Sequence, residues 1–465
     1  MMKTRQQQPI EKQYRAILWL VAMGFFMQQL DSTIINTALP QIASNLNEDP
    51  LSMHGIVVAY VLAMAVTIPI SGWITDKYGL KKTYFTAIIL FSVSSIACAL
   101  SQNLTQLIIA RVFQGIGGAL LQPVGRLTLL KVMPKTQLLA ALSFVSIPGL
   151  IGPLIGPSLG GVLVEWASWH WIFLINIPIG LIGALFTLKI LPDLKEKNIQ
   201  AFDYKGFILI ATSMLSLSFL LEHFTQPQQQ KSSIFILLSI TLIAIFMYRF
   251  HARKKPNAIF STEIFTIRNF KIGILGNFFA RLGNGAIPFL LPLMLQVVLH
   301  LNPTIAGLMM IPLALGSMLI KKYITRLVER FGYRYVLTVN TILVGLGMMS
   351  FAFLSVNTPI WWQVIHFFLF GMVNSIQFTT MNTVSIKDLS QQQAGQGNSI
   401  LSVVQQLSMS MGIALASVAL NAFSQMYGKT HILQSFQYTF LCLGLMTCGA
   451  SLIFFKLKAR VLKHE

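Results

Sequence analysis

The chain has little charge, few acidic residues and almost no cysteine. Only 10% of its 465 residues are Asp, Glu, Lys or Arg, whereas soluble domains carry about 25%. Its three cysteines, Cys98, Cys442 and Cys448, all lie in apolar stretches, so no disulfide framework is predicted. The sequence also lacks a P-loop, an HExxH pair, a Cys-x-x-Cys pair and a catalytic-triad arrangement. We therefore expect neither an ATP-driven pump nor an enzyme, and no metal or other cofactor.

Long apolar segments dominate instead. Hydrophobic residues make up 54% of the chain, and runs of about 20 apolar residues, the length of a membrane-crossing helix, recur from end to end. A segment in lipid must satisfy its own backbone hydrogen bonds, and runs this long exclude a barrel. The sequence predicts an all-α membrane protein with fourteen transmembrane helices at about 16–36, 53–75, 82–101, 104–124, 138–163, 171–191, 203–223, 232–251, 271–297, 304–326, 333–355, 359–381, 398–423 and 434–457.

The net charge of +20 does not indicate nucleic-acid binding, because the basic residues gather in alternate short loops. All but four of the 34 Lys and Arg fall on one side of the expected topology. Lys231 and Lys429 fall on the other side, and Arg111 and Arg281 fall within spans. Because basic loops stay in the cytoplasm, both termini are expected to be cytoplasmic.

A weak internal repeat divides the chain. The stretches 76–81 and 329–334 share the pattern acid, base, aromatic, Gly, any, base, at an offset of 253 residues. We expect two six-helix halves, residues 1–191 and 271–465, with an inserted helix pair and its linkers at 192–270. Such parallel repeats suit a transporter that rocks around a midplane site. Two unrelated basic loops are the alternative.

Asp31 lies inside the first expected span. A charge at the centre of a membrane helix costs roughly 2.5–3.5 kcal/mol, so an intramembrane acid indicates function. The first span runs outward and the fourth runs inward, which places Arg111 at a similar depth. Burial and an opposite charge act in opposite directions on the pKa of a carboxyl group. Separating Asp31 from Arg111 would therefore load or release a proton; a static ion pair is the alternative.

Three motifs resemble those of the major facilitator superfamily. The loop after the second span resembles its cytoplasmic signature Gly-x-x-x-Asp-Arg-x-Gly-Arg-Lys, and Arg111 stands ahead of Gln-Gly as in its fourth-span motif. The fifth span resembles the antiporter signature Gly-x-x-x-Gly-Pro-x-x-Gly-Gly. Small residues permit tight helix packing, and prolines permit bending. The gating residues implied are Gly72, Asp76, Lys77, Gly79, Lys81, Gln114, Gly115, Gly149, Gly152, Pro153, Gly156, Pro157 and Gly160.

The stretches around Asp31 and Trp169–Gly180 further resemble the fourteen-span drug:proton antiporter family. That resemblance implies proton-coupled efflux of small amphipathic or drug-like compounds across the bacterial inner membrane, with the proton gradient as energy source. The implied partners are protons, a small-molecule substrate and the lipid bilayer, and the protein is expected to work as a monomer. An exporter of a specific polar metabolite, such as an organic acid or sugar, is one alternative; a non-transporting membrane sensor is another.

The repeat offset maps Asp31 onto Asn284 and Arg111 onto position 364, close to His366. Arg281 lies near the expected midplane, where an arginine is a functional candidate. Substrate-binding candidates are therefore Asp31, Arg281, Asn284, Asn277, Gln296, His366, Asn374 and Gln377. Each has a structural alternative, since amides bridge helices and a histidine can simply pack.

Overall fold

The computed structural model describes residues 11–134, 136–196, 201–223, 231–255, 258–428 and 431–457; Lys429, one of the exceptions to the charge pattern, lies outside them. Every regular element in these ranges is a helix. Among these residues, thirteen helices are long and apolar enough to cross a membrane, and a shorter apolar helix, Pro303–Leu319, occupies the position expected for the tenth span. The predicted all-α membrane fold is confirmed.

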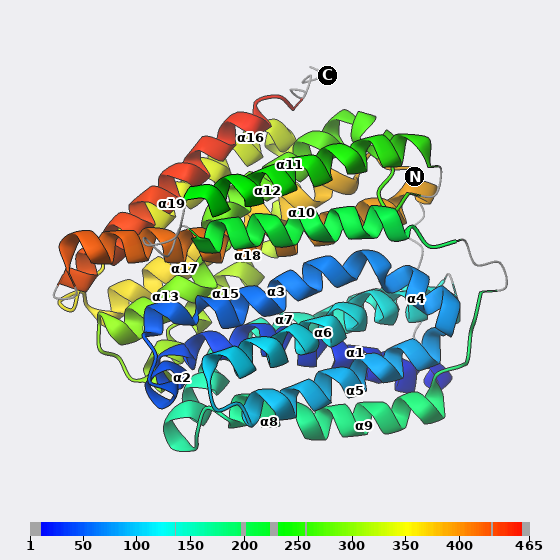
Figure 1. Cartoon of the computed structure of the whole chain (residues 1–465), viewed down its shortest axis with the longest axis horizontal. Helices are drawn as coiled ribbons and strands as arrows, with labels where there is room; N and C mark the ends of the chain where they lie inside the picture. Colours follow the sequence, from blue (N-terminus) through cyan, green and yellow to red (C-terminus); the bar gives the residue numbers. More distant parts are fainter. Residues whose placement is uncertain are drawn as a thin grey trace.

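The helices before residue 200 form an N-terminal group on one side of the molecule (Figure 1). Their bounds are α1 Lys12–Ile34, α2 Leu39–Leu46, α3 His54–Thr67, α4 Ser71–Tyr78, α5 Leu80–Ala99, α6 Leu104–Val132, α7 Leu138–Trp166, α8 Trp171–Leu174 and α9 Asn176–Ile190.

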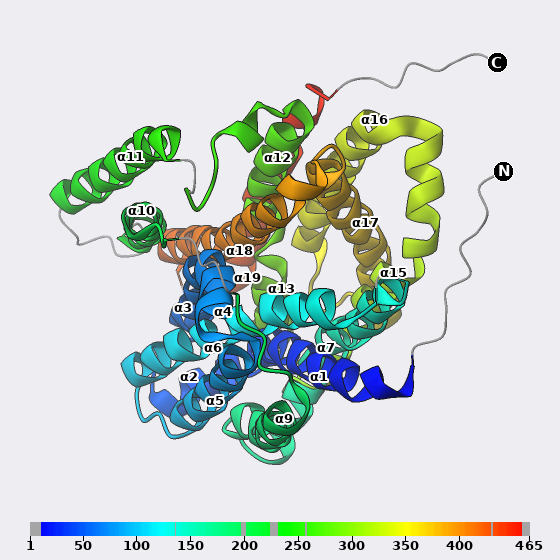
Figure 2. The same ribbon diagram turned by 90° about the vertical axis from the view of Figure 1, so that its right-hand side faces the viewer.

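The helices after residue 260 form a C-terminal group on the other side. Their bounds are α12 Arg268–Asn284, α13 Ile287–Val297, α14 Pro303–Leu308, α15 Ile311–Leu319, α16 Lys321–Ser350, α17 Ile360–Ile386, α18 Gln391–Tyr427 and α19 Ile432–Phe454. Two helices connect the groups, α10 Tyr204–His223 and α11 Lys231–Lys254. Helix α10 runs along α3 and α18, and α11 lies beyond it at the edge of the bundle (Figure 2).

Several expected spans consist of more than one helical segment, and proline accounts for the breaks. Pro69 lies in the short 3-10 turn Ile68–Ile70 between α3 and α4. Pro288 and Pro312 lie in the first turns of α13 and α15. Proline has no backbone N–H and favours the first turn of a helix, so each of these three prolines lies where a new helical segment begins inside one apolar run.

The internal repeat is visible in the backbone. Gly79 has φ +89° and Gly332 has φ +77°, and each separates two helical segments at the same place in its loop. Helix α6 and helix α17 also begin and end near positions related by the same offset of 253 residues. Both loops therefore use the left-handed backbone that glycine adopts without a steric cost.

The two groups meet at one end of the bundle through hydrogen bonds and apolar packing. Gln296 Nε2 donates to the Thr37 carbonyl oxygen at 3.0 Å, and Ser158 Oγ donates to the Gly307 carbonyl oxygen at 3.2 Å. Glu165, at the end of α7 in the N-terminal group, accepts from Nδ2 of Asn302, which lies just before α14 of the C-terminal group, at 3.0 Å. We call this set of contacts the end seam. It joins the two groups at the end of α1 that lies just beyond Asp31.

The two loop glycines give a first prediction. Gly79→Ala and Gly332→Ala should each lower the stability of the protein by about 1–2 kcal/mol, because an L side chain resists positive φ. Gly72→Ala is the matched control: Gly72 lies in helix α4, and an added Cβ would meet nothing within 4 Å. Thermal unfolding in detergent measures all three. Equal melting temperatures for all three variants would contradict the strain expected for an alanine at positions 79 and 332.

Candidate functional site

Asp31 is the centre of a buried polar cluster. It lies three residues before the end of α1 and is 1% exposed. Its Oδ2 accepts from Arg111 Nη1 at 2.7 Å, and its Oδ1 accepts from Gln114 Nε2 at 2.9 Å and from Asn176 Nδ2 at 3.0 Å. Helices α6 and α9 thus bring three side chains to one carboxylate on α1. The structure brings Asp31 and Arg111, which the sequence analysis paired, into direct contact.

Arg111 is held by more than its carboxylate partner. The side chain is fully buried, and Nη1 also donates to Gln114 Oε1 at 2.6 Å. Its guanidinium carbon lies 4.0 Å from the centre of the Tyr60 ring, a cation–π distance. Among the described residues, Nε and Nη2 of Arg111 have no hydrogen-bond partner. Arg111 therefore retains donor groups that a different conformation, or a ligand, could engage.

Gln114 acts as a connector. Besides its bonds to Asp31 and Arg111, its Nε2 donates to Ser95 Oγ at 2.7 Å. Neighbouring Gly115 lets α6 approach α3 closely, since an added Cβ would lie 2.9 Å from Ala63 Cβ. Sequence reasoning selected Gln114 and Gly115 only through the family motif. It did not single out Asn176, Ser95 or Tyr60; an amide such as Asn176 in an otherwise apolar span was the available signal.

The cluster can exchange a proton only if the protein changes shape. A buried carboxylate is costly unless it is paired and hydrogen bonded, and three donors meet that requirement here. A proton on Asp31 would compete with Arg111 for the same oxygens. At 1% exposure Asp31 has no direct contact with solvent. The arrangement therefore suits a site that is sealed while ionised and accepts a proton when its donors withdraw.

The glycine motif of α7 supports the Asp31 segment from behind. An added Cβ at Gly152 would lie 2.9 Å from the Leu30 backbone nitrogen, and one at Gly156 would lie 3.2 Å from Thr33 Cβ. An added Cβ at Gly160 would likewise lie within 3.0 Å of Ile34. An added Cβ at Gly149 would have only Phe25 as a neighbour, at 3.9 Å. Helix α7 is continuous through Pro153 and Pro157, and the Pro157 carbonyl oxygen accepts from Thr37 Oγ1 at 3.1 Å. The glycines thus fix α1 against α7 along the segment that contains Asp31.

The loop motif after α4 forms an ionic cluster within the N-terminal group. Lys131 Nζ lies 3.3 Å from Asp76 Oδ1 and 3.2 Å from Glu196 Oε2. Lys77 Nζ lies over the Trp73 ring at 4.6 Å, and Lys81 is half-buried in the first turn of α5. One expectation is wrong in this conformation. Gly72 permits no close helix approach, because no atom lies within 4 Å of its added Cβ position.

The candidates of the C-terminal group fall into separate networks. Arg281 Nε donates to Asn277 Oδ1 at 3.3 Å, and its guanidinium lies over the Phe378 ring at 4.4 Å. Among the described residues, Arg281 Nη2 has no hydrogen-bond partner. Asn284, the repeat counterpart of Asp31, donates instead to Asn374. A neutral amide, bonded to a second amide, therefore occupies the repeat position of the Asp31 carboxylate.

The remaining candidates have structural partners. Gln377 Nε2 donates to Thr341 Oγ1 at 2.7 Å, between α16 and α17. His366 Nε2 lies 2.6 Å from Ser350 Oγ, and its ring contacts Phe351 at a tilt of 37°, with ring centroids 4.6 Å apart. Gln296 belongs to the end seam. These three residues lie in networks that do not include the Asp31 cluster.

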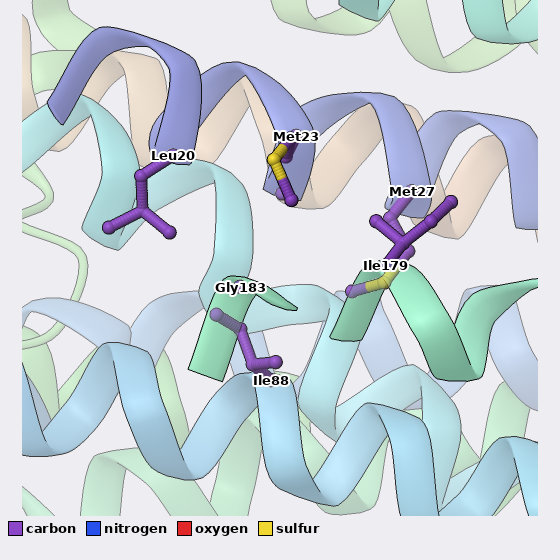
Figure 3. Close-up of a pocket in the computed structure, with 7 residues that line it drawn as sticks. Leu20, Met23, Met27, Ile88, Ile179 and Gly183 are labelled. Atoms are coloured by element: carbon purple, nitrogen blue, oxygen red, sulfur yellow. The ribbon is translucent and has the colours of Figure 1, made fainter. Parts of the chain in front are cut away.

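A small pocket between α1, α5 and α9 does not extend the site. Figure 3 shows its lining of Leu20, Met23, Met27, Ile88, Ile179 and Gly183, with no polar side chain among them. A pocket without hydrogen-bonding side chains cannot orient a polar solute.

Comparison with known proteins identifies the fold family. The sequence model of the Major Facilitator Superfamily matches residues 21–413, and again residues 274–464. The chain belongs to the Major Facilitator Superfamily. Two solved transporters agree in fold at only 13% identity: a D-xylose-proton symporter, with TM-score 0.69 over 95% of this chain and 97% of that chain, and the POT family transporter PepTSo, with TM-score 0.71 over 96% and 97%.

Curated relatives narrow the comparison within the superfamily. A Citrobacter koseri protein is 47% identical over 94% of this chain and 93% of its own length. A Pectobacterium atrosepticum protein is 47% identical over 96% and 97%. Both carry the provisional name multidrug resistance protein MdtD. The sequence also resembles MdtD in particular, through Gln296, region 277–284 and region 374–382, and these relatives confirm that resemblance. This superfamily member is a multi-pass membrane transporter.

The energetics of the cluster give a second prediction. Arg111→Gln should destabilise the protein by about 3–5 kcal/mol at mildly alkaline pH, because it leaves a buried carboxylate without its cation. The double variant Asp31→Asn/Arg111→Gln should recover most of that loss, because no buried charge is then left unpaired. The free energies of unfolding of the wild type, Asp31→Asn, Arg111→Gln and the double variant together form a double-mutant cycle. Additive losses would contradict a direct interaction between the two groups.

Proposed function

We propose that this transporter is a proton-coupled antiporter that exports small amphipathic or drug-like compounds across the bacterial inner membrane. The observation that carries the proposal is the sealed carboxylate: Asp31 is 1% exposed and is bound by Arg111, Gln114 and Asn176 from two other helices. The provisional multidrug resistance name of the 47% identical relatives supports the choice of substrate class.

The proposed topology follows from the distribution of charge. Residues 1–191 and 271–465 form two moving halves, residues 192–270 form an inserted helix pair, and both termini are cytoplasmic. The end seam then lies on the periplasmic side. In this state the periplasmic route is closed, and Asp31 is ionised and paired with Arg111. The transporter works as a monomer and uses no cofactor besides the proton gradient.

The cycle uses competition for one carboxylate. When the halves rock and the end seam opens, Arg111 withdraws and Asp31 takes a proton from the periplasm. When the protein returns to the state described above, substrate binding and renewed pairing with Arg111 favour proton release to the cytoplasm. A membrane potential of 100 mV contributes about 2.3 kcal/mol per proton charge moved inward. One proton could therefore maintain roughly a 50-fold gradient of a neutral substrate, since 1.4 kcal/mol is a factor of ten.

The test is transport in proteoliposomes. Wild-type protein should accumulate a neutral amphipathic probe, radiolabelled chloramphenicol, up to that roughly 50-fold limit when a potential of about 100 mV is imposed without a pH difference. Asp31→Asn should accumulate none above equilibrium, because no titratable group then links the two fluxes.

Glu48→Gln is the control, because Glu48 is an exposed carboxylate in the loop after α2. Its accumulation should match the wild type. Proton-driven accumulation by Asp31→Asn at the wild-type level would overturn the mechanism.

A second candidate function is export of an anionic polar metabolite such as an organic acid. Arg281 favours it, because a half-buried guanidinium with an unpaired Nη2 can bind a carboxylate. Arg281→Ala should then weaken uptake of an anionic probe such as benzoate by about tenfold or more, the loss expected for one charged hydrogen bond. Arg268→Ala, an exposed arginine on the same helix, is the control. Unchanged benzoate uptake by Arg281→Ala would eliminate this candidate.

A further inference from the structure

The end of α11 and the chain that follows it form a basic surface pocket far from Asp31 in sequence. Its lining includes Arg253, Lys254, Lys255, Ser261, Thr262 and Glu263. We call it the α11 pocket. It lies where the inserted helix pair leads into the C-terminal group, just before α12. None of the roles assigned above to the Asp31 cluster or the end seam involves these residues.

The walls of the α11 pocket are fixed by hydrogen bonds. Asp203, immediately before α10 and 2% exposed, lies 2.6 Å from His251 Nε2 and accepts from Lys255 Nζ at 3.0 Å. The Tyr248 hydroxyl accepts from the Phe260 N–H at 2.8 Å and donates to the Phe260 carbonyl oxygen at 2.9 Å. Phe260 therefore lies back against α11, and the pocket is a built feature of the surface.

Asp203 also determines which cations remain available. Burial raises the pKa of this carboxyl, but hydrogen bonds from His251 and Lys255 outweigh burial, and its pKa is lowered overall. Asp203 is thus a carboxylate at neutral pH and neutralises Lys255. The two other cations of the lining, Arg253 and Lys254, are exposed and make no ion pair with any residue that the structure describes.

The remaining lining groups suit an anion better than a cation. The Ser261 hydroxyl oxygen accepts the Glu263 N–H at 3.2 Å, which leaves its proton free to donate. Thr262 adds a second hydroxyl. Glu263 is the single acid of the lining, against the two available cations Arg253 and Lys254. The pocket therefore has a net positive charge together with hydroxyl donors, the donor set that binds phosphate.

A long apolar surface leads away from the α11 pocket along the helix. Only 11% of the most apolar window of α11 is buried inside the protein. Phe246, Met247 and Phe250, in the turns before the pocket, are 62%, 53% and 47% exposed. In a membrane this face contacts lipid acyl chains, and the cations at its end reach the level of the headgroups.

We propose that the α11 pocket binds the phosphate headgroup of an anionic phospholipid, with the acyl chains along the exposed face of α11. Basic pockets at the end of membrane helices attract anionic headgroups electrostatically. The bound lipid would hold the segment after α11 in place at the point where it enters α12. This site is independent of proton coupling at Asp31, and either proposal can fail alone.

The test is lipid binding to the purified full-length protein, measured by native mass spectrometry. Wild-type protein should bind phosphatidylglycerol more tightly than zwitterionic phosphatidylcholine. The variant Arg253→Gln/Lys254→Gln should lose about 30-fold in phosphatidylglycerol affinity, because each basic residue near a membrane surface contributes a factor of about five. The charge-conserving variant Arg253→Lys/Lys254→Arg should retain most of it.

The matched control is Lys322→Gln/Arg326→Gln, which removes one exposed lysine and one exposed arginine from α16. Its phosphatidylglycerol affinity should match the wild type. Equal affinity for the two lipids, an unchanged Arg253→Gln/Lys254→Gln variant, or an equal loss in the control would overturn the proposal. Displacement of the lipid by inorganic phosphate alone would show a site for free anions and would also overturn it.

Discussion

The ion pair between Asp31 and Arg111 is the interaction on which the rest of the structure depends. A carboxylate and a guanidinium that are both fully buried each need several partners to offset the loss of water. The protein supplies them from helices far apart in sequence, through Gln114 on α6 and Asn176 on α9. Any motion that moves α1 relative to α6 or α9 changes the stability of the charged form. The position of these helices and the protonation of Asp31 are therefore physically linked.

Packing transmits that link to the end seam. Gly152, Gly156 and Gly160 hold α1 against α7, and the chain just beyond Asp31 reaches the seam at Thr37. Thr37 bonds both the α7 backbone and, through its carbonyl oxygen, Gln296 of the C-terminal group. The contacts between the two groups thus begin six positions after the carboxylate, at Thr37. The seam and the buried charge therefore lie on one continuous helical span, Lys12–Thr37, rather than on two distant elements.

Sequence reasoning predicted the helices and the central pair because both follow from local or one-dimensional rules. Apolar run length gave the spans, and opposite span directions placed Asp31 and Arg111 at one depth. It predicted less well what depends on three-dimensional packing. Nothing in the local pattern separates Asn176, which contacts the carboxylate, from Gln377, which bonds Thr341 elsewhere. The open space at Gly72 likewise depends on how the helices pack in three dimensions. The helix breaks at Pro288 and Pro312 follow from the missing backbone N–H of proline, which the length of an apolar run does not reveal.

The central claim is that Asp31 itself gains and loses a proton as the protein changes state. Infrared difference spectroscopy of the purified transporter, recorded across steps of pH, measures this without knowledge of the substrate. Wild-type protein should show the carbonyl-stretch band of a protonated carboxylic acid that appears on acidification and is absent from Asp31→Asn. A band of equal intensity in wild type and Asp31→Asn would contradict the account.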